Sequence, residues 1–183
     1  MIEYKNILDE KKIEVLRKII GQNILGIYCN MIDVDVFHNR YISYWGFNIR
    51  FGDTEFIIIK NYWKETKSYI DYWEMDVEFS NEPDNITFDK GKNVIRNAPV
   101  SFNIFQKVVS SIEIYSYTVM EFLNNGESET ITYDKAIVLN FNDDKRMCFA
   151  PVNSIADAVW FTLDEIEIAN YLKESTLRLK VLA

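Results

Sequence analysis

Several segments of this chain alternate apolar and polar residues with a period of two. The clearest is Trp73–Phe79, in which Glu74, Asp76 and Glu78 separate the apolar residues. In a strand, this period places the carboxylates on one face and the apolar residues on the other. We therefore expect a sheet with one face in water and one face on a core, which is typical of antiparallel sheets.

Turn residues join such runs into hairpins. The runs Phe47–Phe51 and Glu55–Lys60 flank Gly52–Thr54, whose composition favours a tight turn. The run Ile137–Phe141 is followed in the same way by the polar turn Asn142–Lys145 and a further strand. Each pattern predicts two neighbouring antiparallel strands.

Two helices are expected. The first begins after Asp9, a suitable N-cap residue, and Gly21 ends it. The second begins at Thr162 and Glu165, which have the spacing of a capping box, and extends to Leu172. With the strands above, these helices predict an α+β fold that is mainly antiparallel sheet.

The 183 residues fit one compact domain, 1–183, and their aromatic and β-branched content excludes global disorder. The order of elements suggests two tandem helix-plus-meander repeats, 10–79 and 102–168, with a connector at 80–101. Residues 105–109 would then form the second helix. The alternative is a chance likeness between two runs of an isoleucine-rich chain.

The net charge of the chain limits the classes of molecule that can be its partner. The net charge is −8, and neither half of the chain has a basic stripe, so nucleic acid is excluded as a partner while a basic protein is not. The sequence shows no secretion signal and no apolar run of membrane-span length, so a cytoplasmic protein is expected. No cofactor motif is present. Cys29 and Cys148 lie in apolar segments and are expected to be reduced and buried.

One group of residues could carry chemistry. Asp33 and Asp35 share one strand face, and His38 follows, so the three could form a hydrolytic or metal-binding site. The alternative is a solvated strand whose core-facing residues are Ile32, Val34 and Val36.

Aromatic and acidic residues coincide in the first half of the chain. Of the 27 aromatic residues, 13 lie between Phe37 and Phe79. Tyrosine and tryptophan serve as binding hot spots, and carboxylates steer a cationic partner. The candidate partner-binding residues are Asp33, Asp35, Tyr44, Trp45, Tyr62, Trp63, Glu74, Asp76 and Glu78.

In size, acidity and composition, with hairpins such as Ala136–Phe141 followed by Asn142–Asp144, the chain resembles the immunity proteins that bacteria keep against their own toxins. The resemblance implies a non-enzymatic inhibitor that binds a basic toxin and blocks its active site or a neighbouring surface. Two other classes remain open. One is an enzyme that uses Asp33, Asp35 and His38, and the other is a module that binds sugars or peptides on exposed Tyr and Trp.

Overall fold

The computed structural model describes residues 2–96, 100–102, 107–123 and 126–182 of the chain. Within these residues, the elements in chain order are β1 (Ile2–Asn6), α1 (Glu10–Arg17), β2 (Asn23–Ile24), β3 (Gly26–Cys29), β4 (Asp33–Asp35), β5 (Arg40–Ser43), β6 (Phe47–Arg50), β7 (Phe56–Glu65), β8 (Asp71–Ser80), β9 (Thr87–Asp89), β10 (Val94–Arg96), β11 (Val100–Phe102), β12 (Lys107–Phe122), β13 (Ser128–Phe141), β14 (Arg146–Pro151), β15 (Val159–Thr162), α2 (Glu165–Leu172) and β16 (Thr176–Val181).

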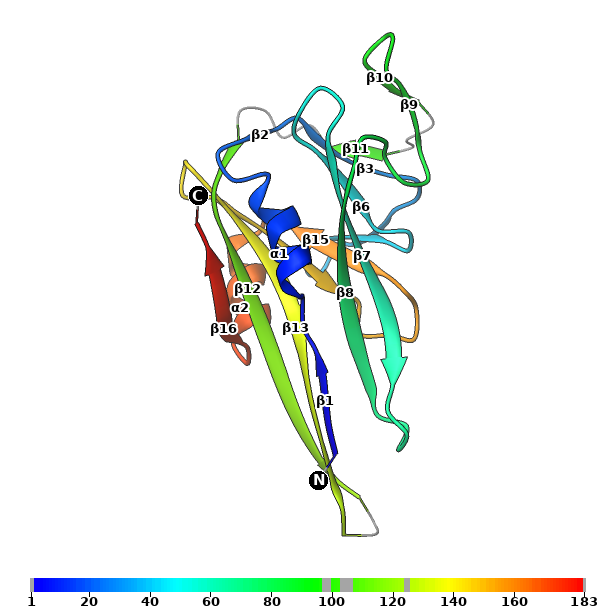
Figure 1. Ribbon diagram of the computed structural model, residues 1–183, viewed down its shortest axis with the longest axis vertical. Helices are drawn as coiled ribbons and strands as arrows, with labels where there is room; N and C mark the ends of the chain where they lie inside the picture. The colour runs from blue at the N-terminus through cyan, green and yellow to red at the C-terminus, as the bar shows by residue number, and fades with distance from the viewer. Residues whose placement is uncertain (1, 97–99, 103–106, 124–125, 183) are drawn as a thin grey trace.

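Two sheets hold most of the strands (Figure 1). The nine-stranded sheet has the order β16-β12-β13-β14-β15-β5-β4, with β1 beside β13 and β2 beside β12. The five-stranded sheet has the order β11-β3-β6-β7-β8, and β9 and β10 form a separate hairpin. The path of each sheet is antiparallel, whereas β1 pairs with β13 in parallel. The predicted α+β class with mainly antiparallel sheet is confirmed.

One hydrophobic core joins the two sheets. Ile57 and Met75 of the five-stranded sheet belong to the same buried cluster as Ile137 and Phe161 of the nine-stranded sheet. Leu16 of α1 is in this cluster too, and α1 lies between β12–β13 and β8 in Figure 1. The alternation of apolar and polar residues in β8 has the predicted result, because Met75 and Val77 of its apolar face are buried in this core.

Helix α2 covers the outer face of the nine-stranded sheet. Its buried residue Ile168 packs in a second cluster with Ala136, Cys148 and Trp160. The two cysteines therefore lie in different clusters, because Cys29 belongs to the core between the sheets. Both thiols are buried and unpaired, as predicted.

The helix ends differ from the predicted ones. Asp9 is the N-cap of α1, as expected, but the helix ends at Arg17 and Gly21 lies beyond it with φ +79°. The cap of α2 is Asp164, whose carboxylate accepts from two backbone N–H groups, and not Thr162. The hydroxyl of Thr162 is occupied elsewhere, since it donates to the carbonyl of Asn39 at 2.7 Å.

The two halves share a meander but not a helix. Strands β3-β6-β7-β8 and β12-β13-β14-β15 each form four neighbouring antiparallel strands. The helix predicted at 105–109 is wrong where it can be checked, because Lys107–Val109 opens β12. Phe105 and Gln106 lie outside the described residues. The predicted connector contains the β9–β10 hairpin and β11. A duplication of the meander stays a prediction.

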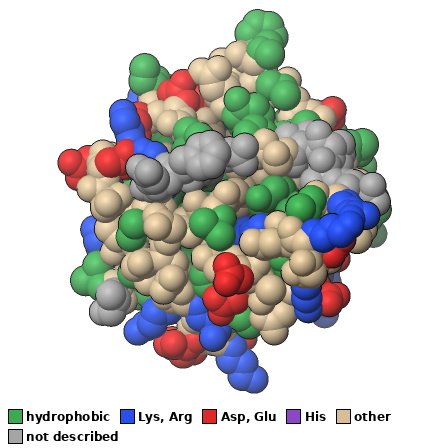
Figure 2. Space-filling model, turned by 90° about the horizontal axis from the view of Figure 1, so that it is seen from above, with side chains coloured by type: hydrophobic (Ala, Val, Ile, Leu, Met, Phe, Trp, Pro, Cys, Tyr) green, Lys and Arg blue, Asp and Glu red, His purple; other side chains and the backbone are tan. Residues whose placement is uncertain are grey.

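Charges of both signs are mixed on the surface. Figure 2 shows the end of the molecule at which β9 and β10 lie, where acidic and basic side chains intersperse around the rim. Among the described residues, no helix is long and apolar enough to cross a membrane.

Candidate functional site: an aromatic pocket beside an edge strand

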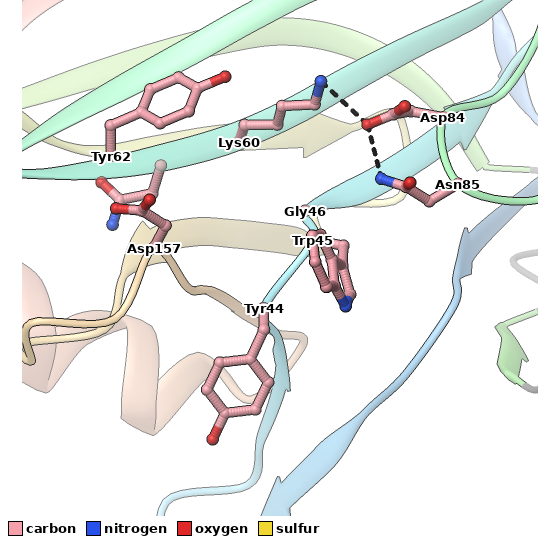
Figure 3. A pocket seen from close by; sticks show the side chains of 9 residues that line it. Tyr44, Trp45, Gly46, Lys60, Tyr62, Asp84, Asn85 and Asp157 are labelled. Atoms are coloured by element: carbon pink, nitrogen blue, oxygen red, sulfur yellow. Dashed lines mark hydrogen bonds and ion pairs between the residues drawn. The ribbon is translucent and has the colours of Figure 1, made fainter.

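A pocket of about 290 Å³ lies where four segments meet (Figure 3). The segments are the β5–β6 turn, strand β7, the loop after β8 and the loop between β14 and β15. We call it the aromatic pocket; its lining residues are Tyr44, Trp45, Gly46, Lys60, Asn61, Tyr62, Asp84, Asn85 and Asp157. It brings together three predicted binding residues, Tyr44, Trp45 and Tyr62.

The β5–β6 turn presents the two exposed rings. Gly46 has φ +83°, and a Cβ atom there would come within 2.4 Å of the carbonyl oxygen of Ile59, so only glycine fits. Ser43 fixes the turn by donating from its hydroxyl to the Gly46 carbonyl at 2.8 Å. Tyr44 and Trp45 are held at the rim, with exposed fractions of 40% and 54%.

Asn61 forms part of the pocket wall and is only 2% exposed. Its amide nitrogen donates to the carbonyl of Ala158 at 3.2 Å. Its Oδ1 is buried and has no hydrogen-bond partner among the described residues. A buried acceptor without a donor costs free energy, so this oxygen marks a place where an N–H or O–H group would be stabilised.

Lys60 is held by carboxylates on the opposite side of the pocket. Its ammonium lies 2.9 Å from Asp84 Oδ2 and 3.6 Å from Glu78 Oε2. Burial lowers the pKa of Lys60, but the hydrogen bond and charge of Asp84, with the charge of Glu78, outweigh burial, so the pKa is raised. Asn85 also donates to Asp84 Oδ2, at 3.0 Å. The Lys60 charge is therefore already neutralised.

Asp157 contributes a carboxylate that pairs with no cation of the described residues. Its Oδ1 accepts from the backbone N–H of Trp63 at 2.6 Å, and Oδ2 has no partner among the described residues. The pKa of Tyr62 is raised, first by burial, and further by the charges of Asp76, Glu78 and Asp157 against the opposing charge of Lys60. The pocket lining therefore holds two carboxylates against one ammonium.

Strand β4 joins the aromatic pocket through one hydrogen bond, in which the Tyr44 hydroxyl donates to Asp33 Oδ2 at 2.9 Å. This strand is the edge of the nine-stranded sheet, and no strand of the described residues pairs with its far side. The predicted inward orientation is wrong for Val34 and Val36, which are 54% and 70% exposed. Ile32 is partly buried and packs against the core between the sheets, as predicted. Phe37, in the following turn, is 92% exposed. We call residues 33–37 the β4 edge.

Asp35 and His38 interact with each other and not with Asp33. Asp35 accepts from the backbone N–H groups of Phe37 and His38, and its Oδ2 lies 2.7 Å from His38 Nδ1. The side-chain bond to His38 is the main cause that lowers the pKa of Asp35. Within the described ranges, no three acidic, histidine or cysteine residues converge as a metal site would require.

The acidic face of β8, which the sequence predicts to steer a cationic partner, is largely neutralised by lysines of the same chain. Lys12 of α1 lies 2.9 Å from Asp76, and Lys64 of β7 lies 3.4 Å from Glu74. Together with Lys60 on Glu78, each of the three predicted carboxylates has a lysine. The lysines belong to α1 and β7, so the sequence of β8 alone does not indicate these ion pairs.

Trp63 lies outside the lining of the aromatic pocket but contacts one of its residues. Its backbone N–H bonds to Asp157, and its indole Nε1 donates to Asp71 Oδ1 at 2.9 Å. The lining residues that sequence reasoning missed are Gly46 of the β5–β6 turn and the polar residues Lys60, Asn61, Asp84, Asn85 and Asp157. Three of these are polar residues of loops or turns, and only the sheet order reveals that they meet.

Comparison with protein-family models, with curated proteins and with solved structures finds no match to this chain.

Proposed function

We propose that this chain is a non-enzymatic binding protein that recognises a basic protein partner through the aromatic pocket and the β4 edge. In this role it would act as an immunity-type inhibitor of a basic toxin, in the cytoplasm of the cell that makes both. The observation that supports the proposal most is the exposure of Tyr44 and Trp45 at the rim of a pocket that contains two carboxylates. Tyrosine and tryptophan are enriched in binding hot spots, and carboxylates beside them would steer a cationic partner.

The β4 edge extends this surface. An edge strand presents unpaired backbone groups, and natural proteins usually protect such edges with charge or cover. Here the edge is three residues long and carries Asp33 and Asp35, and Val34, Val36 and Phe37 are exposed beside them. Exposed apolar side chains next to carboxylates favour contact with another protein, and the net charge of −8 favours a basic one.

The test uses the reading frame next to this gene, which under the proposal encodes a basic toxin domain. Its purified product should form a 1:1 complex with this protein, and co-expression should restore growth to cells that the product alone inhibits. Trp45→Ala should weaken both effects, whereas Phe122→Ala, which removes an 80% exposed ring of β12 outside the pocket lining, should not. An adjacent product that neither binds nor inhibits growth contradicts the proposal.

A further inference from the structure

We infer that the aromatic pocket receives the guanidinium group of an arginine side chain from the partner, an inference that rests on the proposed function.

The first argument is the balance of donors and acceptors. One N–H of Asn61 and one N–H of Asn85 donate to protein atoms, and the Lys60 ammonium is held by Asp84 and Glu78. Four oxygens of the lining have no partner among the described residues and can only accept: Asn61 Oδ1, Asp84 Oδ1, Asn85 Oδ1 and Asp157 Oδ2. The complement of such a set is a group that only donates. Guanidinium carries five N–H donors and no acceptor.

The second argument is charge. The lining residues include one lysine against two aspartates, and that lysine is engaged by Asp84 and by Glu78 outside the lining. Asp157 has no cationic partner among the described residues. A cation entering the pocket would therefore complete a charge pair, whereas an anion would face an uncompensated carboxylate.

The third argument is shape. Tyr44, Trp45 and Tyr62 give the pocket aromatic walls, and Figure 3 shows the Trp45 indole nitrogen pointing away from Lys60 and Asp84. A planar guanidinium stacks on aromatic faces while its edge forms hydrogen bonds, which a compact ammonium cannot do. A sugar hydroxyl carries no charge and would leave the Asp157 carboxylate without a cation.

The experiment titrates the whole protein with Nα-acetyl-arginine amide while the tryptophan indole N–H resonances are followed by NMR, with Trp45 assigned through Trp45→Phe. The Trp45 resonance should shift and saturate. Nα-acetyl-citrulline amide has the same shape without the charge, and should bind at least about tenfold more weakly. The lysine analogue should also bind more weakly. Citrulline or lysine analogues that match arginine, or a neutral sugar such as N-acetylglucosamine that shifts Trp45 instead, overturn the inference.

Two variants test whether the binding of arginine amide depends on the carboxylate of the aromatic pocket. Asp157→Asn keeps an oxygen for the Trp63 backbone N–H, so the fold is retained, and it should weaken arginine-amide binding about tenfold. Asp71→Asn makes the same charge change at a carboxylate that also bonds Trp63 but lies outside the pocket, and it should leave binding unchanged. Equal effects of the two variants contradict the inference.

The outcomes separate the two proposals. Arginine-amide binding without any basic protein partner would contradict the proposed function alone. A basic partner whose affinity is indifferent to Asp157→Asn would contradict the arginine inference alone.

Discussion

The hydroxyl of Tyr44 donates a 2.9 Å hydrogen bond to Asp33, and this bond links the edge strand β4 to the rim of the aromatic pocket. The bond and the charge of Asp33 raise the pKa of Tyr44, because they stabilise the protonated phenol. Asp33→Asn should therefore lower this pKa towards the ordinary value of about 10. A titration of the Tyr44 ring carbon by NMR checks the direction. No change in Asp33→Asn would show that the bond is absent in solution.

Stability should depend on the buried Asp134. Its carboxylate accepts two hydrogen bonds from Arg178 of β16, at 2.8 and 2.7 Å, and one from the backbone N–H of Leu8 at 2.7 Å. Asp134→Ala leaves these donors unsatisfied and should lower the free energy of unfolding by about 3 kcal/mol. Urea denaturation measures the change. The control is Glu14→Gln, which breaks an exposed pair with Arg17 and should cost less than about 0.5 kcal/mol.

The contact between the two sheets should depend on Phe161. Its ring lies 4.9 Å from that of Phe47 in the five-stranded sheet and 5.6 Å from that of Phe149 in its own. Phe161→Ala should destabilise the protein by about 3–5 kcal/mol, because it leaves a cavity between the sheets. Phe37→Ala removes the same group from a 92% exposed position. If thermal melting moves equally for both variants, the core is wrongly assigned.

Alkaline pH should destabilise the protein through its thiols. Burial raises the pKa of Cys29 to about 11 and that of Cys148 to about 12. The unfolded chain ionises its thiols at lower pH than the folded one does. Their contribution to stability is therefore complete below about pH 8.5 and is lost as the pH rises towards the folded values. Cys29→Ser with Cys148→Ala should flatten this decline in urea-melt stability between pH 8 and 10. Rapid reaction of either thiol with Ellman's reagent under native conditions would contradict their burial.

Local sequence patterns predicted the strands and turns that depend only on neighbouring residues. The alternation in β8 and the turn between β6 and β7 are properties of neighbouring residues, and both are confirmed. Strand β1 was missed because its partner, β13, is more than 120 residues away and pairs with it in parallel. Period two also cannot distinguish an inner strand from an edge strand, which is why Val34 and Val36 were assigned to the core.

The candidate site was partly predictable for the same reason. Aromatic density indicated Tyr44, Trp45 and Tyr62, but Asp84 and Asp157 come from loops whose positions depend on the sheet order. The lysines on the β8 carboxylates likewise come from α1 and β7. Charge pairing of this kind is a tertiary property, so the sequence showed the carboxylates without their partners.

Binding kinetics with the product of the adjacent reading frame test the central claim most directly. Asp33→Asn combined with Asp157→Asn should slow association at low salt and weaken its salt dependence, since exposed charges steer a basic partner. Trp45→Ala should instead speed dissociation, with a loss of about 2 kcal/mol or more in binding free energy. Glu14→Gln, on the exposed surface of α1, should change neither rate. If Trp45→Ala dissociates at the wild-type rate and the double variant associates at the wild-type rate, the aromatic pocket and the β4 edge are not the interface.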